Sequence, residues 1–244
     1  MTTYSFLIGL GASLAILRVV QNVPRWQSPR WSNAALISLL GLLIGARLVY
    51  VIFQWSYFRS HLLEIFALWT GGLAWIGAIA GALISLWIIS SRWKTSILKI
   101  ADGLSPMAPP LVVSAWLGSW LAGFAYGPLA PEGAFWGIPG PDETGVALPR
   151  FPLQLIAAVS MLIFAFWLET RKTSYKWDGQ KAALMLLGLA GDLLIFMPLR
   201  ADPAPNWLGI RLDVWGALIV FLFSAGFYYW VNFRRTQLHE SNPS

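Results

Sequence analysis

Long runs of apolar residues, separated by shorter polar connections, make up most of this chain. Seven of these runs approach or exceed the roughly 20 residues that a helix needs to cross the hydrocarbon core of a bilayer. They predict transmembrane helices over residues 4–22, 33–54, 68–89, 104–124, 153–169, 182–198 and 214–233. The pattern indicates an all-α polytopic membrane protein, with one seven-span domain over residues 1–233 and a short, polar, mobile tail over residues 234–244.

Basic residues divide unevenly between the two sides of this predicted bundle. Arg59, Arg150, Arg200 and Arg211 lie on one side, and Arg47 lies within the second span. The other 12 of the 17 Lys and Arg residues lie on the opposite side, namely Arg18, Arg25, Arg30, Arg92, Lys94, Lys99, Arg171, Lys172, Lys176, Lys181, Arg234 and Arg235. Because short cytoplasmic loops are enriched in Lys and Arg, the N-terminus is predicted to lie outside and the C-terminus in the cytoplasm.

Composition narrows the chemistry that the chain can carry. It contains no Cys, which excludes disulfides, thiolate nucleophiles and Cys-based metal sites. Its two His residues, His61 and His239, have no second ligand type at metal spacing, so we expect no metal and no cofactor. The net charge of +6 lies in loops beside the membrane, where it attracts anionic lipid headgroups, so we expect no nucleic-acid partner.

Ionisable groups inside predicted spans are the best pointers to a site, since a charge in hydrocarbon is costly unless it is paired or hydrated. Arg47 lies in the second span, and Tyr50 follows it by one turn on the same helix face. Asp192 lies midway through the sixth span. An Arg47–Asp192 ion pair stays open, because the sequence does not bring their helices together. Asp102 precedes the fourth span, where it would favour a helix N-terminus.

Two glycine-rich segments each allow two interpretations. Gly77 and Gly81 form a G-x-x-x-G pattern in the third span, which indicates either close helix packing alone or the wall of a site. The outer connection over residues 125–152 is long and rich in Gly and Pro, and it contains Glu132, Asp142, Glu143 and Arg150. It is either a functional loop or a solvated linker.

Read in chain order, short motifs of this sequence resemble those of prolipoprotein diacylglyceryl transferases, over nearly the whole chain from Tyr4 to about Trp230. The matching residues are Tyr4 at the start of the first span; Gly45, Arg47 and Tyr50, similar to Gly-x-Arg-x-x-Tyr; Trp69, Gly71, Gly72, Gly77 and Gly81; Asp102 and Pro106; Gly118, Gly123, Tyr126 and Gly127; Phe135, Trp136 and Gly137; and Arg150, Pro152, Gln154 and Leu155.

The chain departs from the family pattern at several polar positions. The signature His of the third span is Ile76, and the Arg of the fourth-span Gly-Arg-Leu-Gly-Asn motif is Trp116. The Asn of that motif and the polar residues around the following glycine are replaced too, as is the His that closes the outer loop; these positions hold Ser119, Ala122, Phe124 and Phe151.

The resemblance implies a multi-pass protein of the bacterial inner membrane that moves the diacylglyceryl group of phosphatidylglycerol onto the lipobox Cys of a preprolipoprotein. It assigns catalysis to Tyr4. It assigns phosphatidylglycerol binding to Arg47, Tyr50, Arg150, Gln154 and Arg200, and a lipid cavity to Gly71, Gly72, Gly77, Gly81, Gly118, Gly123 and Gly127. A catalytically silent homologue that binds phospholipid or a partner stays open as the alternative. A transporter is disfavoured, because only Arg47 and Asp192 are clearly intramembrane charges.

Overall fold

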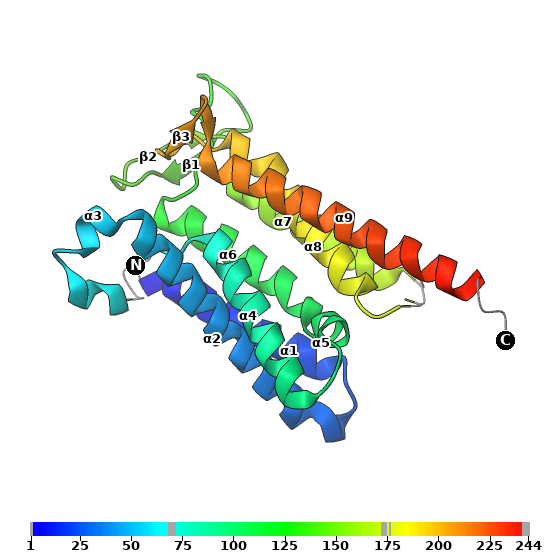
Figure 1. Ribbon diagram of the computed structural model, residues 1–244. Helices are drawn as coiled ribbons and strands as arrows, with labels where there is room; N and C mark the ends of the chain where they lie inside the picture. The colour runs from blue at the N-terminus through cyan, green and yellow to red at the C-terminus, as the bar shows by residue number, and fades with distance from the viewer. Residues whose placement is uncertain (1, 68–71, 172–174, 176, 241–244) are drawn as a thin grey trace.

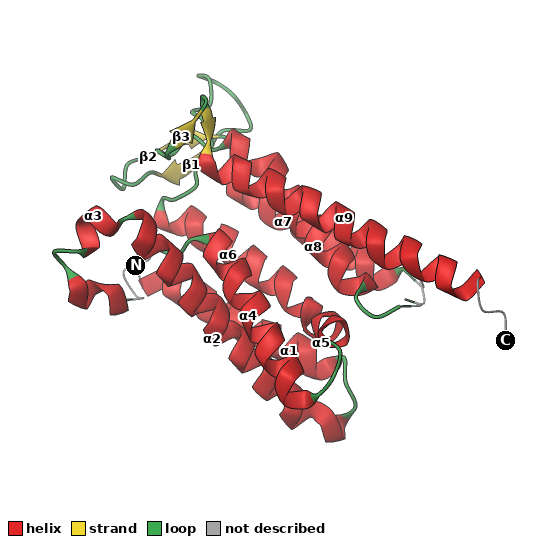
Figure 2. Ribbon diagram, in the orientation of Figure 1, coloured by secondary structure: helices red, strands yellow, loops and turns green. Residues whose placement is uncertain are grey.

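The protein is almost entirely helical in the computed structural model, which describes residues 2–67, 72–171, 175 and 177–240, with no side chains for residue 2 or residues 234–240. Two small hairpins lie at one end of the helices (Figure 2). The helices are α1 (Thr2–Gln21), α2 (Ser28–Phe53), α3 (Trp55–Phe58), α4 (Trp75–Trp93), α5 (Ile97–Leu104), α6 (Ala108–Ala122), α7 (Leu153–Thr170), α8 (Gln180–Phe196) and α9 (Leu212–Glu240), and the strands are β1 (Ile138–Pro141), β2 (Ala147–Arg150), β3 (Asn206–Trp207) and β4 (Ile210–Arg211).

Six helices within the described residues are long and apolar enough to cross a membrane. They cover Thr3–Gln21, Arg25–Phe53, Trp75–Trp93, Leu153–Thr170, Gln180–Leu199 and Leu212–Phe233. These segments overlap six of the seven predicted spans, which confirms a polytopic helical membrane protein.

The fourth predicted span, 104–124, is shorter and more broken than the sequence pattern indicated. Helix α6 covers only 15 residues, about 22 Å at 1.5 Å per residue. It follows the short 3-10 helix η4 (Ser105–Met107) and helix α5. Pro106, Pro109 and Pro110 have no backbone N–H to continue a helical ladder. At the other end, Gly123 stops the helix with a left-handed φ of +75°.

The third predicted span and the tail also differ from their predicted bounds. The span was predicted from residue 68, but α4 begins at Trp75, after Gly72 at φ +73° and extended Ala74; residues 68–71 lie outside the described residues. Helix α9 continues to Glu240, so the backbone of the predicted mobile tail is helical for its first seven residues.

Helices α2 and α4 approach each other with almost no side chain between them. A Cβ on Gly81 would lie 2.0 Å from the carbonyl oxygen of Gly41, and one on Gly77 would lie 2.2 Å from that of Gly45. Glycine on both helices therefore lets the two backbones touch, as small-x-x-x-small patterns do in membranes. The packing interpretation of Gly77 and Gly81 is confirmed.

Apolar residues fill two separate cores. One core joins α1, α2, α4, α5 and η4 through Ala15, Val19, Ala34, Ala35, Ile89, Ile100, Leu104 and Met107. The other joins α6, α7, α8 and α9 and contains Trp116, Ala125, Leu153, Ala157, Ala158, Leu193, Phe196, Met197 and Ala217. Packing of α1 along α6, and of α6 along α7, connects the two groups (Figure 1).

One contact ties the start of α8 to a helix far earlier in the chain. The Asp102 carboxylate, on α5, accepts hydrogen bonds from the backbone N–H groups of Gly179 (2.6 Å) and Ala182 (2.8 Å). These are among the first N–H groups of α8, which no carbonyl within the helix can satisfy. Asp102 therefore caps α8, although the sequence placed it at the fourth span.

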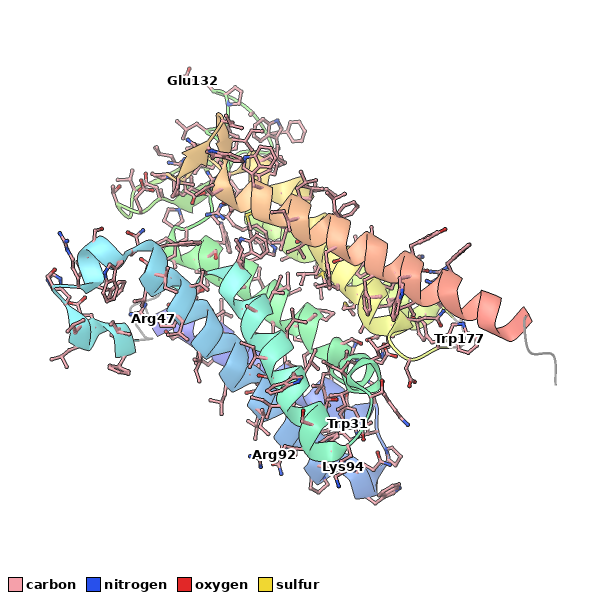
Figure 3. All side chains as sticks on the ribbon, in the orientation of Figure 1. Trp31, Arg47, Arg92, Lys94, Glu132 and Trp177 are labelled. Atoms are coloured by element: carbon pink, nitrogen blue, oxygen red, sulfur yellow. The ribbon has the colours of Figure 1, made fainter. Side chains whose placement is uncertain are left out.

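The two hairpins mark the end of the bundle that the charge pattern assigned to the outside. Strands β1 and β2 pair antiparallel within the 125–152 connection, so this segment is folded rather than a plain linker. Strands β3 and β4 pair in the connection between α8 and α9. Figure 3 shows Glu132 at this end, whereas Arg92, Lys94 and Trp177 lie at the opposite end.

Candidate functional site

A cavity of about 400 Å³ lies beside the outer end of α2. Three of its lining residues come from separate motifs of the sequence: Arg47 and Tyr50 from α2, and Gly72 from the segment before α4. Gln54, Tyr57, Phe58 and Glu64 complete the lining. The cavity therefore combines a cation, a carboxylate, an amide and phenol groups with aromatic walls.

The Arg47 side chain is buried, with 4% of its surface exposed, and backbone carbonyls hold it in place. Its Nε donates to the carbonyl of Ile65 (2.9 Å), its Nη2 to that of Glu64 (2.5 Å) and its Nη1 to that of Gly72 (3.2 Å). The guanidinium carbon also lies 5.2 Å from the ring centre of Phe58. Arginine can make these contacts together because its donors form a fixed planar fork.

Gly72 is required by the ring that covers it. A Cβ at this position would lie 2.3 Å from Cε1 of Tyr50, and the backbone has a left-handed φ of +73°. Both constraints favour glycine. The Gly-x-Arg-x-x-Tyr motif of α2 and the glycine pair before α4 thus meet in one place, although about 25 residues separate them in the chain.

A short segment after α2 closes one side of the cavity; we call it the outer arm, and it consists of α3, the 3-10 helix η2 (Leu62–Phe66) and the turn between them. Phe58 points inward and is buried. The Tyr57 hydroxyl donates to the Glu64 carboxylate (2.7 Å), and this hydrogen bond raises the pKa of Tyr57. The His61 ring stacks on Tyr57 with ring centres 4.4 Å apart.

Arg150 lies at the end of β2, away from the Arg47 cavity, and is held by an acid and an aromatic ring. Its Nη2 donates to Asp142 (3.2 Å), and its guanidinium carbon lies 4.2 Å from the ring centre of Tyr126. Its Nε is buried and has no hydrogen-bond partner. A buried donor without a partner is costly, and this one marks where an acceptor would fit.

The residues around Arg150 show shifted pKa values for stated reasons. Hydrogen bonds from Thr144 are the main cause that lowers the pKa of Asp142, and the neighbouring Arg150 lowers it further. The Tyr126 hydroxyl donates to Glu143 (2.5 Å). This bond, together with burial, raises the pKa of Tyr126 to about 12. The hairpin therefore presents ionised acids and neutral Tyr126 at neutral pH.

Arg200 belongs to a four-residue charge cluster beside the second hairpin. It pairs with Asp202 (2.5 Å) and Asp213 (3.2 Å), and Arg211 pairs with the same two acids. Two cations and two anions make this cluster electrically balanced. It lies next to the Arg150 region, because the N–H of Ala201 donates to the carbonyl of Tyr126 (2.9 Å). The structure thus places Arg150 and Arg200 at neighbouring positions and Arg47 at the separate cavity.

The two positions where the family has a His and an Arg are filled by apolar packing. Ile76 lies one turn into α4 and packs against α9, where a Cβ on Gly216 would lie 2.8 Å from its Cδ1. Trp116 is buried in the second core, and its Nε1 donates to Asp192 (3.1 Å). The Ser160 hydroxyl donates to the other oxygen of Asp192. Asp192 is therefore held by α6 and α7.

The other predicted site residues lie at helix contacts. The Tyr4 ring packs on α6, because a Cβ on Gly118 would lie 2.9 Å from its Cδ2. Gln154 is buried and donates to the carbonyl of Phe124 (3.0 Å). Gly123 and Gly127 adjoin backbone, with Asp142 and Phe151 as their close neighbours. Among the described glycines of the predicted set, Gly72 lines the Arg47 cavity; Gly71 lies outside the described residues.

Sequence reasoning missed four of the residues that line the cavity: Gln54, Tyr57, Phe58 and Glu64. Gln54 could have been found, because it follows Arg47 by seven residues and therefore shares its helix face. The three residues of the outer arm gave no such signal, since a short segment after a span carries no periodicity that fixes its direction.

Comparison with known proteins identifies the family. The description of the family that matches residues 1–230 is prolipoprotein diacylglyceryl transferase. The phosphatidylglycerol–prolipoprotein diacylglyceryl transferase of Cupriavidus pinatubonensis is 27% identical over 227 residues, which cover 89% of this chain and 80% of the relative. The protein of the same name in Methylibium petroleiphilum is 29% identical over 94% of this chain and 89% of the relative. The one in Paracidovorax citrulli is 30% identical over 86% and 78%. The chain belongs to the prolipoprotein diacylglyceryl transferase family.

Proposed function

We propose that this protein binds phosphatidylglycerol at its outer end and transfers the diacylglyceryl group to the Cys thiol of a prolipoprotein. One observation carries the proposal: Arg47, Tyr50 and Gly72 come from two separate family motifs, and they line a single cavity in a chain that matches the family along its length. The relatives are named for this reaction.

The reaction joins the thiol sulfur to a glycerol carbon and breaks the bond from that carbon to the phosphate oxygen. The thiol loses its proton, and glycerol phosphate leaves with the bonding electrons. Cationic donors stabilise charge that develops on the phosphate. Arg47 supplies such a donor beside the Tyr50 phenol. We propose Arg150, with its unpartnered Nε, and Arg200 as further headgroup contacts, with Gln154 positioning the outer loop and Tyr4 at the reacting group.

A second candidate function is favoured by a specific observation. Ile76 and Trp116 are built into helix contacts, and neither can carry a proton or bind phosphate as His and Arg do. A homologue that binds phospholipid, or a partner, without transferring it would keep the cavity and lose these groups. The transfer assay below separates the two functions.

We propose seven crossings of the bacterial inner membrane, with the N-terminus outside. The segment from α5 through η4 to α6 would make the fourth crossing, which the odd number of sides requires. The distribution of basic residues supports this orientation. A reporter fused after Arg235 should read cytoplasmic, and one inserted between residues 131 and 149 should read external. An external signal from the C-terminal fusion would contradict the orientation.

Lipid binding can be tested on purified protein by native mass spectrometry. Phosphatidylglycerol should remain bound to the unmodified protein and be retained less by Arg47→Met. The double variant Arg150→Ala, Arg200→Ala tests the second group of cations in the same way. Arg59→Met is the matched control, because Arg59 is an exposed cation of the outer arm that does not line the cavity. Equal retention by Arg47→Met and the control would remove Arg47 from the binding site.

Transfer can be tested with a lipobox peptide and vesicles that contain phosphatidylglycerol. The unmodified protein should produce diacylglyceryl peptide, and Arg47→Met should lower the rate by roughly a hundredfold, since one preorganised donor is worth about 10²–10³ in rate. Growth of a bacterial strain that lacks its own transferase, when it carries this chain, would give the same answer in cells. Bound lipid without any transfer would establish the second function.

A further inference from the structure

The outer arm carries an apolar surface that nothing in the protein covers. Leu63 is 89% exposed, Phe66 is 76% exposed and Leu62 is 57% exposed. Leu63 and Phe66 are three residues apart in η2, and a 3-10 helix has three residues per turn, so both side chains point the same way. Three large apolar side chains on so short a segment form a surface that favours a partner.

The arm is held in place, so this surface is a fixed feature of the fold. Arg47 donates to the carbonyls of Glu64 and Ile65, within η2 itself. Phe58 is buried against α2, with its ring centre 6.0 Å from that of Tyr50. The inner side of the arm is thus packed on the cavity wall, and Leu63 and Phe66 are kept outward.

The surface continues the lipid-facing side of α2. Ile44, Leu48 and Ile52 are more than half exposed along that helix, and Trp55 follows them at the start of the arm. Figure 1 shows the arm beyond the outer end of α2 and turned to the side of the helices, where the edge of the bilayer meets the protein. The exposed polar residues Arg59, Ser60 and His61 form its turn, where lipid headgroups would lie.

From this continuity we propose that the outer arm is an interfacial anchor: η2 inserts Leu63 and Phe66 into the outer leaflet, at the boundary between headgroups and acyl chains. Short segments with one apolar face and a polar, partly cationic edge bind at this depth, and Trp and Tyr prefer it as well. The occupant of the surface is therefore the phospholipid interface. The anchor would hold the cavity at Arg47 level with the headgroups.

The absence of Cys makes the test direct, because a single introduced Cys is the only labelling site. Leu63→Cys and Phe66→Cys each receive an environment-sensitive fluorophore, and the labelled proteins are placed in phosphatidylcholine vesicles. Glu132→Cys, on an exposed turn of the outer loop, is the aqueous control. Ile44→Cys, on the exposed side of α2, is the control within the bilayer.

The labels at positions 63 and 66 should emit at shorter wavelength than the label at position 132. A lipid-attached quencher near the top of the acyl chain should quench them several-fold more than one near the chain end, with the reverse order at position 44. Emission and quenching equal to those at position 132 would overturn the anchor. Lipid-independent shifts that appear only at high protein density would also overturn it, because they would show a second copy of the chain as the occupant.

Discussion

Arg47 and Asp192 are two ionisable residues inside membrane-spanning helices, and the protein surrounds them in opposite ways. Backbone carbonyls from one irregular segment hold Arg47, which lines a cavity at the outer end. The Trp116 indole and the Ser160 hydroxyl hold Asp192, which is buried in an apolar core. The first arrangement leaves a space in which a ligand can reach the charged residue, whereas the second fills that space with side chains.

The difference shows what the cost of an intramembrane charge does and does not predict. The cost explains why both residues need partners. It does not tell whether those partners form a binding site or a helix contact. The backbone around Arg47 is irregular and leaves a cavity, while the three helices around Asp192 run without interruption through the contact.

The largest expected effect comes from breaking the helix contact on which the Arg47 side depends. Gly81→Val would place a side chain against the Gly41 carbonyl, where the first added atom already lies 2.0 Å away. We expect a loss of at least about 2 kcal/mol of stability, as overpacking commonly costs, seen as a lower melting temperature in detergent. The matched control is Gly226→Val on α9, where nothing lies within 4 Å. Similar losses in both variants would show that helix propensity, and not the α2–α4 contact, determines the effect.

Arg47→Met should have the next largest effect. It leaves three carbonyls without their donor, and hydrogen bonds from a charged group contribute about 1.5–3 kcal/mol each. We expect about 3 kcal/mol in total after relaxation, measured by thermal unfolding beside Arg59→Met. Arg47→Lys should recover only part of this, because an ammonium group lacks the planar fork.

Asp192→Leu should cost less, about 1–3 kcal/mol, because it leaves the Trp116 indole and the Ser160 hydroxyl without an acceptor. Asp192→Asn keeps the shape and an acceptor oxygen, so its melting temperature should stay closer to that of the unmodified protein. Neither variant should change phosphatidylglycerol retention by native mass spectrometry. Lipid loss in Asp192→Asn would remove the distinction between the two regions.

The smallest expected effect is a pH dependence at the first hairpin. The pKa of Asp142 is lowered in the folded protein, so its ionised form stabilises the fold above the ordinary aspartate pKa of about 3.9. That contribution is lost as the pH falls through the lowered value. The difference in melting temperature between the unmodified protein and Asp142→Asn should therefore be constant from neutral pH to about pH 5 and shrink below about pH 4. A difference that grows in acid would contradict this sign.

The helices were predictable where apolar runs are long and uninterrupted, as in α1, α2, α7, α8 and α9. Prediction was poorer where proline and glycine act on the backbone. Pro109 and Pro110 shorten α6, and Gly72 delays the start of α4. Hydrophobicity averages over such residues, so a run of apolar side chains can predict a span that the backbone does not continue.

The candidate site was predictable only along one helix at a time. The spacing of Arg47 and Tyr50 placed them on one face, and they line one cavity. The contacts that cross the chain were not predictable: Glu64 and Ile65 reach Arg47 from the outer arm, and Asp102 caps α8 rather than its own segment. A single sequence carries no periodic signal for pairs that are formed by tertiary folding.

The cap that Asp102 provides gives the assembly of the membrane domain a direction in time. Asp102 leaves the ribosome 77 residues before Gly179, whose N–H group it accepts. The helix that it caps therefore meets a carboxylate that is already in place when its own first turn emerges. Replacing Asp102 with Ala would leave the early helices able to insert but slow the docking of α8. A pulse-chase experiment on the nascent chain, with protease protection as the readout, would show this as a delay confined to the later helices.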